Sequence, residues 1–163
     1  MVWQEFQRKA SVTMFSGKVE VRLLLPNDIS WGRLNDINGL LLRQHSKAVA
    51  VRQAELVSFT EKEKVVVAWL DDRIVGVGVL FFRPCLTFSY GEIRHVEVEK
   101  DIFDSLVTKK RIVEELFEHA RAITKISRVL ISVHEDDVDL AAVLEALGLK
   151  AESKLRYRLI IKR

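Results

Sequence analysis

The stretch of residues 91–120, GEIRHVEVEKDIFDSLVTKKRIVEELFEHA, decides the fold that we expect. Its first part, residues 93–98, is rich in β-branched side chains and predicts a strand. After a short charged loop, apolar residues recur at every third or fourth position, which predicts an amphipathic helix. These positions are Leu106, Val113, Leu116, Phe117, Ala120 and Ile123. A strand that enters a helix through a tight loop is a common phosphate-binding unit of α/β proteins, but this loop contains no glycine.

The rest of the chain alternates between β-branched runs and segments with helical periodicity. Strands are expected over residues 18–25, 65–70, 74–82, 93–98, 128–133 and 153–162. Helices are expected over residues 29–44, 49–59, 106–123 and from 136 or 137 to 147, with residues 60–64 as a solvated connection. The order β-α-α-β-β-β-α-β-α-β is that of one three-layer α/β domain with a mixed sheet.

Several residues mark the ends of these elements. Pro26 ends the first strand, and Asn27 or Asp28 is expected to cap the first helix. The link Asp71-Asp72-Arg73 is typical of a β-hairpin, and Gly148 is expected to end the last helix as its C′ residue. The final strand alternates: Leu155, Tyr157, Leu159 and Ile161 are expected to face inward, and Lys154, Arg156, Arg158 and Lys162 outward.

Length and composition describe an ordinary globular domain. A chain of 163 residues that is 48% hydrophobic can bury a core without disulfides or metal ions, and Cys85 is its single cysteine. We expect residues 18–163 to form the domain and residues 1–17 an N-terminal extension that either docks on it or is partly ordered. No apolar run approaches the roughly 20 residues of a membrane span, and no secretory signal is visible, so we expect a cytoplasmic protein.

The order of elements and several phrases together resemble the GNAT superfamily of acyl-CoA-dependent N-acyltransferases. The phrases are VEVRLLLPNDI, VVVAWLDDRIVGVGVLF, YGEIRHVEVE, RIVEELFEHARAITKISRVLISVHEDD and LEALGLKAESKLRYRLI, which lie within residues 19–162. The resemblance implies a single three-layer α/β (α+β) domain. Its mixed, mostly antiparallel sheet would carry helices on both faces.

The resemblance also implies acetyl-CoA as co-substrate. In GNAT proteins the central strand diverges from the next strand, pantetheine lies against it, and the pyrophosphate sits on amides at the start of the central helix. Carried over to this chain, the cofactor-binding positions are Val96, Val98, Ser105, Val107, Thr108, Lys109, Lys110 and Asp137. Backbone amides near Val96 and Val98 would polarise the thioester carbonyl.

The pyrophosphate loop departs from the family pattern. That loop is usually Arg/Gln-x-x-Gly-x-Gly/Ala, because glycines let the backbone approach the phosphates. Here no glycine occurs between Gly91 and Gly148. Asp104 would repel a diphosphate, and it or Ser105 is expected to cap the central helix instead. The basic run Lys109, Lys110 and Arg111 either compensates this charge or forms a solvated helix face.

The last helix departs from the pattern as well. Four residues before the corner glycine, many GNAT members carry a tyrosine that protonates the departing CoA thiolate. Leu144 stands at that position and cannot donate a proton. Near the start of the same helix the family usually has an asparagine, where this chain has Asp137. The chain therefore differs from the family pattern at three places: the pyrophosphate loop, the tyrosine position and the asparagine position.

Glu92 and His95 are the candidate catalytic residues. Glu92 matches the place where some GNAT members hold the glutamate that takes a proton from the acceptor amine through water. His95 is a second candidate for this role, because histidine titrates near neutral pH. The alternatives are a surface carboxylate at a strand end and a partly buried, hydrogen-bonded histidine. No metal site is expected, because the four histidines and Cys85 have no metal-ligand spacing.

Three functions stay open on the sequence alone. The first is an N-acetyltransferase that moves an acetyl group from acetyl-CoA to an amine of a small molecule or a protein. The second is a GNAT-fold binding or regulatory module that has lost acetyl-CoA binding and has a protein partner or forms a homodimer. The third and least favoured is a nucleic-acid module that uses the basic outward row of residues 153–162, which more simply protects an edge strand. No membrane partner is expected.

Overall fold

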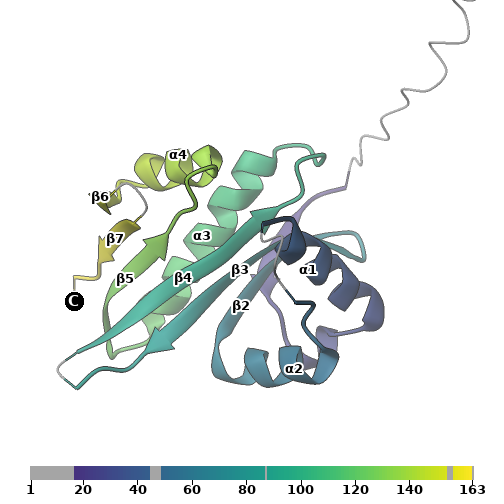
Figure 1. Cartoon of the computed structure of the whole chain (residues 1–163), viewed down its shortest axis with the longest axis horizontal. Coiled ribbons are helices and arrows are strands. Elements are labelled where there is room, and N and C mark those ends of the chain that lie inside the picture. Colours follow the sequence, from purple (N-terminus) through teal and green to yellow (C-terminus); the bar gives the residue numbers. More distant parts are fainter. Residues whose placement is uncertain (1–16, 45–48, 87, 154–155, 163) are drawn as a thin grey trace, which may run out of the picture.

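One mixed β-sheet organises the domain (Figure 1). The computed structural model describes residues 17–44, 49–86, 88–153 and 156–162, and its seven described strands have the order β1-β2-β3-β4-β5-β7-β6. The strands are β1 (Glu20–Leu23), β2 (Lys64–Leu70), β3 (Arg73–Arg83), β4 (Ser89–Val98), β5 (Ile126–Ser132), β6 (Lys150–Ser153) and β7 (Arg156–Ile160). Strands β4 and β5 run parallel, and the other described neighbours are antiparallel.

Helices cover both faces of this sheet, which confirms the expected fold class. The helical elements are η2 (Pro26–Asp28), α1 (Trp31–Gln44), α2 (Gln53–Lys62), α3 (Ser105–Ala122) and α4 (Val138–Ala146). One core cluster joins α1 and α2 to strands β2 and β3. A second, larger cluster joins α3 and α4 to the opposite face. Hydrophobic residues on both sides are therefore buried in one three-layer domain.

Two glycines of β3 let α3 pack closely on the sheet. A Cβ atom on Gly78 would lie 2.6 Å from Cγ2 of Ile112 and 2.9 Å from Cδ1 of Leu116. A Cβ atom on Gly76 would lie 2.9 Å from Cδ1 of Ile112. Because both α3 side chains are fully buried, no side chain fits at these two strand positions.

Most of the expected elements are present. The β2–β3 hairpin turns at Asp71 and Asp72 as expected. Asp137 caps α4 by accepting a hydrogen bond from the Leu140 amide, and Gly148 follows that helix with φ +78°. Residues 1–16 lie outside the described residues, so the N-terminal extension stays a prediction.

The segment from η2 to β2 corrects two expectations, the cap of the first helix and the bounds of the second helix with the connection that follows it. Asp28 accepts a hydrogen bond from the Leu25 amide and stabilises η2, whereas Ser30 Oγ accepts from the Arg33 amide near the start of α1. The second helix begins later and ends later than expected, because α2 runs over Gln53–Lys62. The expected solvated connection over 60–64 is therefore wrong, since most of it belongs to α2 or to β2.

The C-terminal region corrects a third expectation. Residues 153–162 were expected to form one edge strand, but the chain pairs two short strands, β6 and β7. Strand β7 lies between β5 and β6, so it is not an edge. Its alternation is confirmed within the described residues, because Tyr157 is buried while Arg156 is exposed. Lys154 and Leu155 lie outside the described residues.

Candidate functional site

The central strand diverges from its parallel neighbour halfway along its length. The described pairs between β4 and β5 run from Ser89 to Ile93 and end there, while β4 stays paired with β3 as far as Val98. His95, at the point of divergence, has φ +58°, and the β3–β4 register shifts between Val77 and Val79. This is a β-bulge in β4, and a bulge bends a strand away from its neighbour.

The divergence opens a cavity of about 360 Å³, which we call the cleft cavity. It is lined by Arg94, His95, Val96, Ser132, Val133, His134 and Leu140. Backbone strain at a non-glycine residue such as His95 is common at ligand-binding positions. The cleft cavity is therefore the place where an extended ligand could enter between the two strands.

The start of α3 presents backbone amides that favour an anion. The first turn of a helix has N–H groups without acceptors inside the helix, and the helix dipole adds partial positive charge. The first intrahelical bond here runs from the Thr108 amide to the carbonyl of Asp104, at 2.9 Å. Asp104 occupies the N-cap position in the left-handed conformation, with φ +57°, and its side chain makes no capping hydrogen bond. The expected side-chain cap by Asp104 is therefore wrong.

The surroundings of this helix start disfavour an anion. A depression of about 540 Å³, which we call the acidic hollow, lies beside the first turn of α3. Its described carboxylates are Glu97, Asp101, Asp136, Asp137 and Asp139, and its lysines and arginines are Arg43, Lys100 and Lys109. Arg43 already contacts Glu99, at 3.5 Å. Carboxylates therefore outnumber cations next to the amides that a diphosphate would need.

Lys109 is committed to a partner inside the acidic hollow. Its Nζ lies 2.9 Å from Oδ1 of Asp137, and the two side chains are 11% and 13% exposed. The same Asp137 oxygen caps α4, so the pair joins the start of α3 to the start of α4. Lys109 is thus no part of a solvated helix face, although Lys110 is exposed as expected and lies 3.8 Å from Glu114. The position of Lys109 on the same helix face as Ile112 and Val113 was the available signal.

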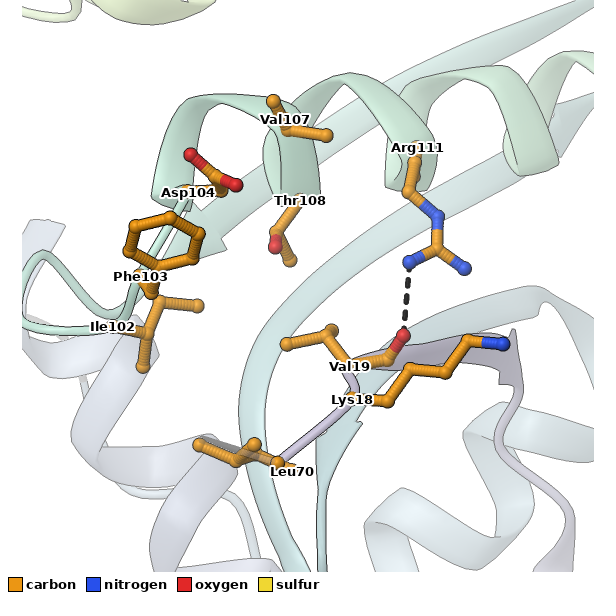
Figure 2. A pocket seen from close by; sticks show the side chains of 10 residues that line it. Lys18, Val19, Leu70, Ile102, Phe103, Asp104, Val107, Thr108 and Arg111 are labelled. Carbon is orange, nitrogen blue, oxygen red and sulfur yellow. Dashed lines mark hydrogen bonds between the residues drawn. The ribbon is translucent and has the colours of Figure 1, made fainter. Parts of the chain in front are cut away.

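Two of the expected cofactor residues, Val107 and Thr108, line a third cavity (Figure 2). This α3–β1 cavity, of about 480 Å³, lies between the first turns of α3 and the chain around Val19. Val107 and Thr108 line it, together with Leu70. Arg111 donates a hydrogen bond to the carbonyl of Val19 across it, at 2.9 Å, as Figure 2 shows.

The expected cofactor residues are thus distributed over several places. The acidic hollow brings together Val98, Ser105, Lys109 and Asp137. The cleft cavity holds Val96, with His95. Val107 and Thr108 face the α3–β1 cavity, and Lys110 lines none of these three. These residues therefore do not form a single continuous set of phosphate contacts.

Glu92 is held by two arginines. Its Oε1 accepts hydrogen bonds from Arg94, the shorter at 2.5 Å, and its Oε2 accepts one from Arg83 at 3.1 Å. Burial acts to raise the pKa of Glu92, but the hydrogen bonds from Arg94 and Arg83 outweigh it and hold the pKa below its usual value. A carboxylate with both oxygens bound and a lowered pKa is a weak general base.

The side chains of His95 and Leu144 are also packed against other residues. The His95 ring lies against Phe81, with ring centroids 6.2 Å apart. Leu144, at the position of the family tyrosine, is fully buried in the core between α3, α4 and the sheet. Within the described ranges, no group of three or more potential metal ligands gathers, and no helix is long and apolar enough to cross a bilayer.

Comparison with known proteins identifies the fold. No protein-family model and no curated protein matches the chain. An acetyltransferase from Trypanosoma brucei superposes with a TM-score of 0.65 at 21% identity, over 83% of this chain and 95% of that one. A GNAT-family acetyltransferase from Streptococcus pneumoniae gives 0.67 at 14% identity, over 88% and 100%. A transcriptional regulator from Bacillus halodurans gives 0.66 at 18% identity, over 83% and 95%. The chain has the GNAT fold.

Acetyl-CoA fits one part of this site and not the other. The divergence of β4 from β5 leaves room for an extended arm in the cleft cavity. The acidic hollow does not fit a diphosphate, because its carboxylates repel phosphate and its buried cation, Lys109, is already neutralised by Asp137.

Proposed function

We propose that this chain is a GNAT-fold binding module without acetyl-CoA-dependent acyl transfer. The observation that carries the proposal is the charge of the acidic hollow, in which the buried Lys109 is paired with Asp137. Two further observations support it. Leu144 stands where a tyrosine would protonate the thiolate, and Glu92, bound by two arginines, is a weak general base.

Magnitudes favour repulsion over attraction at the start of α3. An anion at a helix N-terminus gains typically 0.3–1 kcal/mol, and up to about 2 kcal/mol in partly buried geometries. Each carboxylate about 6 Å from a phosphate charge costs about 0.7–3 kcal/mol, depending on how well water screens the pair. Apart from the Lys109–Asp137 pair, four described carboxylates of the acidic hollow stand against Arg43 and Lys100, so the remaining charge is negative and opposes what the helix start supplies.

Thermal unfolding with acetyl-CoA tests the proposal. A ligand present at 100 times its Kd stabilises the folded state by about 2.7 kcal/mol. We expect no change in Tm with acetyl-CoA up to millimolar concentration at low salt. A dose-dependent rise of several degrees would contradict the proposal.

A charge variant sharpens the same experiment. Asp101→Asn with Asp136→Asn removes two exposed carboxylates from the acidic hollow, and we expect it to bind acetyl-CoA more tightly than the wild type. Glu61→Gln with Glu118→Gln makes the same change of charge at exposed positions near the C-terminal ends of α2 and α3, neither of which lines the hollow, and is the matched control. Equal behaviour of the two variants would show that the hollow's charge does not decide binding.

Acyl transfer is the second candidate function, and the divergence of β4 from β5 favours it. Its test is the release of CoA thiol from acetyl-CoA in the presence of a panel of amines. Ser132→Phe places a ring in the cleft cavity from an exposed position and is the control. We expect no amine-dependent release by the wild type. Release that Ser132→Phe abolishes would make acyl transfer the function instead.

A further inference from the structure

One half of the sheet has a face that no described helix covers (Figure 1). Helices α1 and α2 pack against β2 and β3, while α3 and α4 pack on the opposite face. On the N-terminal half of β4 and on β5 and β7, side chains that point away from α3 and α4 are therefore without a described helix above them. Ile160 is 59% exposed, and Ser132 and Arg94 are exposed as well.

The strand register places this open face in three rows. The first row runs Arg83, Tyr90, Arg128 and Ile160 across β3, β4, β5 and β7. The second runs Glu92, Leu130, Arg158 and Lys150, and the third contains Arg94, Ser132, Arg156 and Ser153. We call these residues, with Phe88 and Glu152 beside them, the open face.

The open face is strongly basic. It carries five arginines and Lys150 against two carboxylates, Glu92 and Glu152. This excess of positive charge is larger than the net charge of the whole chain, which is +3. The positive charge of the protein is therefore concentrated on one surface, which attracts anions and speeds their approach.

Several arginines of this face are held in fixed orientations. Glu92 binds Arg83 and Arg94 on either side, at 3.1 Å and 2.5 Å. The Arg128 guanidinium stacks 4.3 Å from the ring centre of Phe88 and 5.8 Å from that of Tyr90. Nε of Arg128 is buried without a hydrogen-bond partner among the described residues. Arg158 is likewise held by Glu152, at 3.1 Å. Unlike the buried ammonium of Lys109, these guanidinium groups are partly exposed and keep N–H donors that the carboxylates do not use, so they can still bind phosphate oxygens.

Protection of a sheet edge does not explain these charges. Charged side chains on an edge strand prevent pairing with other chains, but β7 is enclosed by β5 and β6. Arg128 and Arg94 likewise lie on β5 and β4, in the interior of the sheet. The basic row therefore needs another explanation.

We propose that the open face binds single-stranded nucleic acid. Arginine is suited to phosphate oxygens because its planar fork makes two parallel hydrogen bonds. Aromatic rings on an exposed sheet, here Phe88 and Tyr90, provide surfaces on which unpaired bases stack. An acidic peptide would use the arginines but not the rings. The acidic hollow shares no residue with the open face, so the charge argument against a diphosphate and the charge argument for this face rest on different side chains. Arg94 and Ser132 also line the cleft cavity, at one end of the face.

Fluorescence anisotropy with labelled 12-mers tests the inference on the full chain. A mixed-sequence RNA and its DNA counterpart provide the two arms, and binding of either one supports the proposal, with a tighter RNA arm indicating contacts to the 2′-hydroxyl. Binding should weaken with salt, with a log–log slope of about −0.7 for each phosphate contact. We expect a slope of about −2 to −3.

Variants assign the binding to this surface. Arg156→Ala with Arg158→Ala should lower affinity at least tenfold and reduce the salt slope by about 1.4, because two phosphate contacts are lost. Lys110→Ala with Arg121→Ala removes the same charge from exposed positions of α3 and should bind as the wild type does. Phe88→Ala should weaken binding with an unchanged salt slope, because it removes stacking and no charge.

Several results would overturn the inference. One is the absence of salt-dependent binding to both oligonucleotides. Another is an equal loss of affinity in the α3 control variant and the β7 variant. A third is that a labelled poly-glutamate peptide binds more tightly than the oligonucleotides. Circular dichroism establishes that each variant is folded. If the β7 variant fails to fold, the affinity of Arg94→Ala for the oligonucleotides tests the same surface, because Arg94 is exposed on β4.

Discussion

The acidic hollow lies at the C-terminal end of β4 and the start of α3, whereas the open face lies on β4, β5 and β7, and the two carry opposite charge. At the start of α3, described carboxylates surround the amides that the fold offers to an anion. On the open face, arginines from β3, β4, β5 and β7 surround a strip of aromatic rings. In this chain the open face therefore carries more net positive charge than the helix start that phosphate-binding folds commonly use.

Alternation along a strand explains how both surfaces arise from the same elements. Successive residues of a strand point to opposite faces, so β4 places Ile93 toward α3 and Glu92 and Arg94 on the open face. β5 does the same with Ile131 and Leu130. The composition of one face can therefore change without disturbing the core on the other.

The largest expected effect concerns the cation that the acidic hollow holds. Asp137→Ala leaves Lys109 buried without its partner and removes the cap of α4, so it should lower the free energy of unfolding by about 3–5 kcal/mol. Urea denaturation measures this. Asp136→Ala, one residue earlier and exposed, is the control and should stay within about 0.5 kcal/mol of the wild type. A small effect of Asp137→Ala would mean that Lys109 is available to other anions.

The next effect compares the two faces of β5 directly. Ile131 is fully buried under α3 and α4, whereas its neighbour Leu130 is partly exposed on the open face. Ile131→Ala should destabilise the fold by about 2–4 kcal/mol, and Leu130→Ala by about 1 kcal/mol. The measurement is again the change in unfolding free energy. Equal losses would show that another part of the chain covers the open face.

The smallest effect concerns pH and Glu92. Because its folded pKa lies below the usual value of 4.5, its ionised form stabilises the fold above that pH. The contribution is lost as the pH falls through the folded pKa. Glu92→Gln should therefore be about 1 kcal/mol less stable at pH 7 and approach the wild type as the pH falls below 4.5. A stability difference that does not change over this range would contradict the two ion pairs.

Local patterns were enough to predict most of the fold. The β-branched runs around Asp71-Asp72 gave the hairpin, and the apolar spacing after Ser105 gave α3. Asp137 and Gly148 were recognisable as helix ends, because capping depends on residues only a few positions away. The end of α2 was placed wrongly because the charged run that completes it has no apolar periodicity.

The site depended on contacts that local patterns do not contain. The bulge at His95 uses a left-handed conformation that only a few per cent of non-glycine residues adopt, so the local sequence does not predict it. The pairing of Lys109 with Asp137 joins residues 28 positions apart. The open face became visible only from the strand order, since β7 was expected at an edge and instead lies inside the sheet.

Backbone amide NMR during two titrations tests the central claim, that anions bind the open face and not the acidic hollow. With the 12-mer RNA, we predict shifts concentrated on Arg128, Leu130 and Arg158, which lie on the open face. With acetyl-CoA at the same ionic strength, we predict no shifts for Ser105 to Lys109. Shifts of those amides on addition of acetyl-CoA, with β5 and β7 unaffected by RNA, would contradict the account.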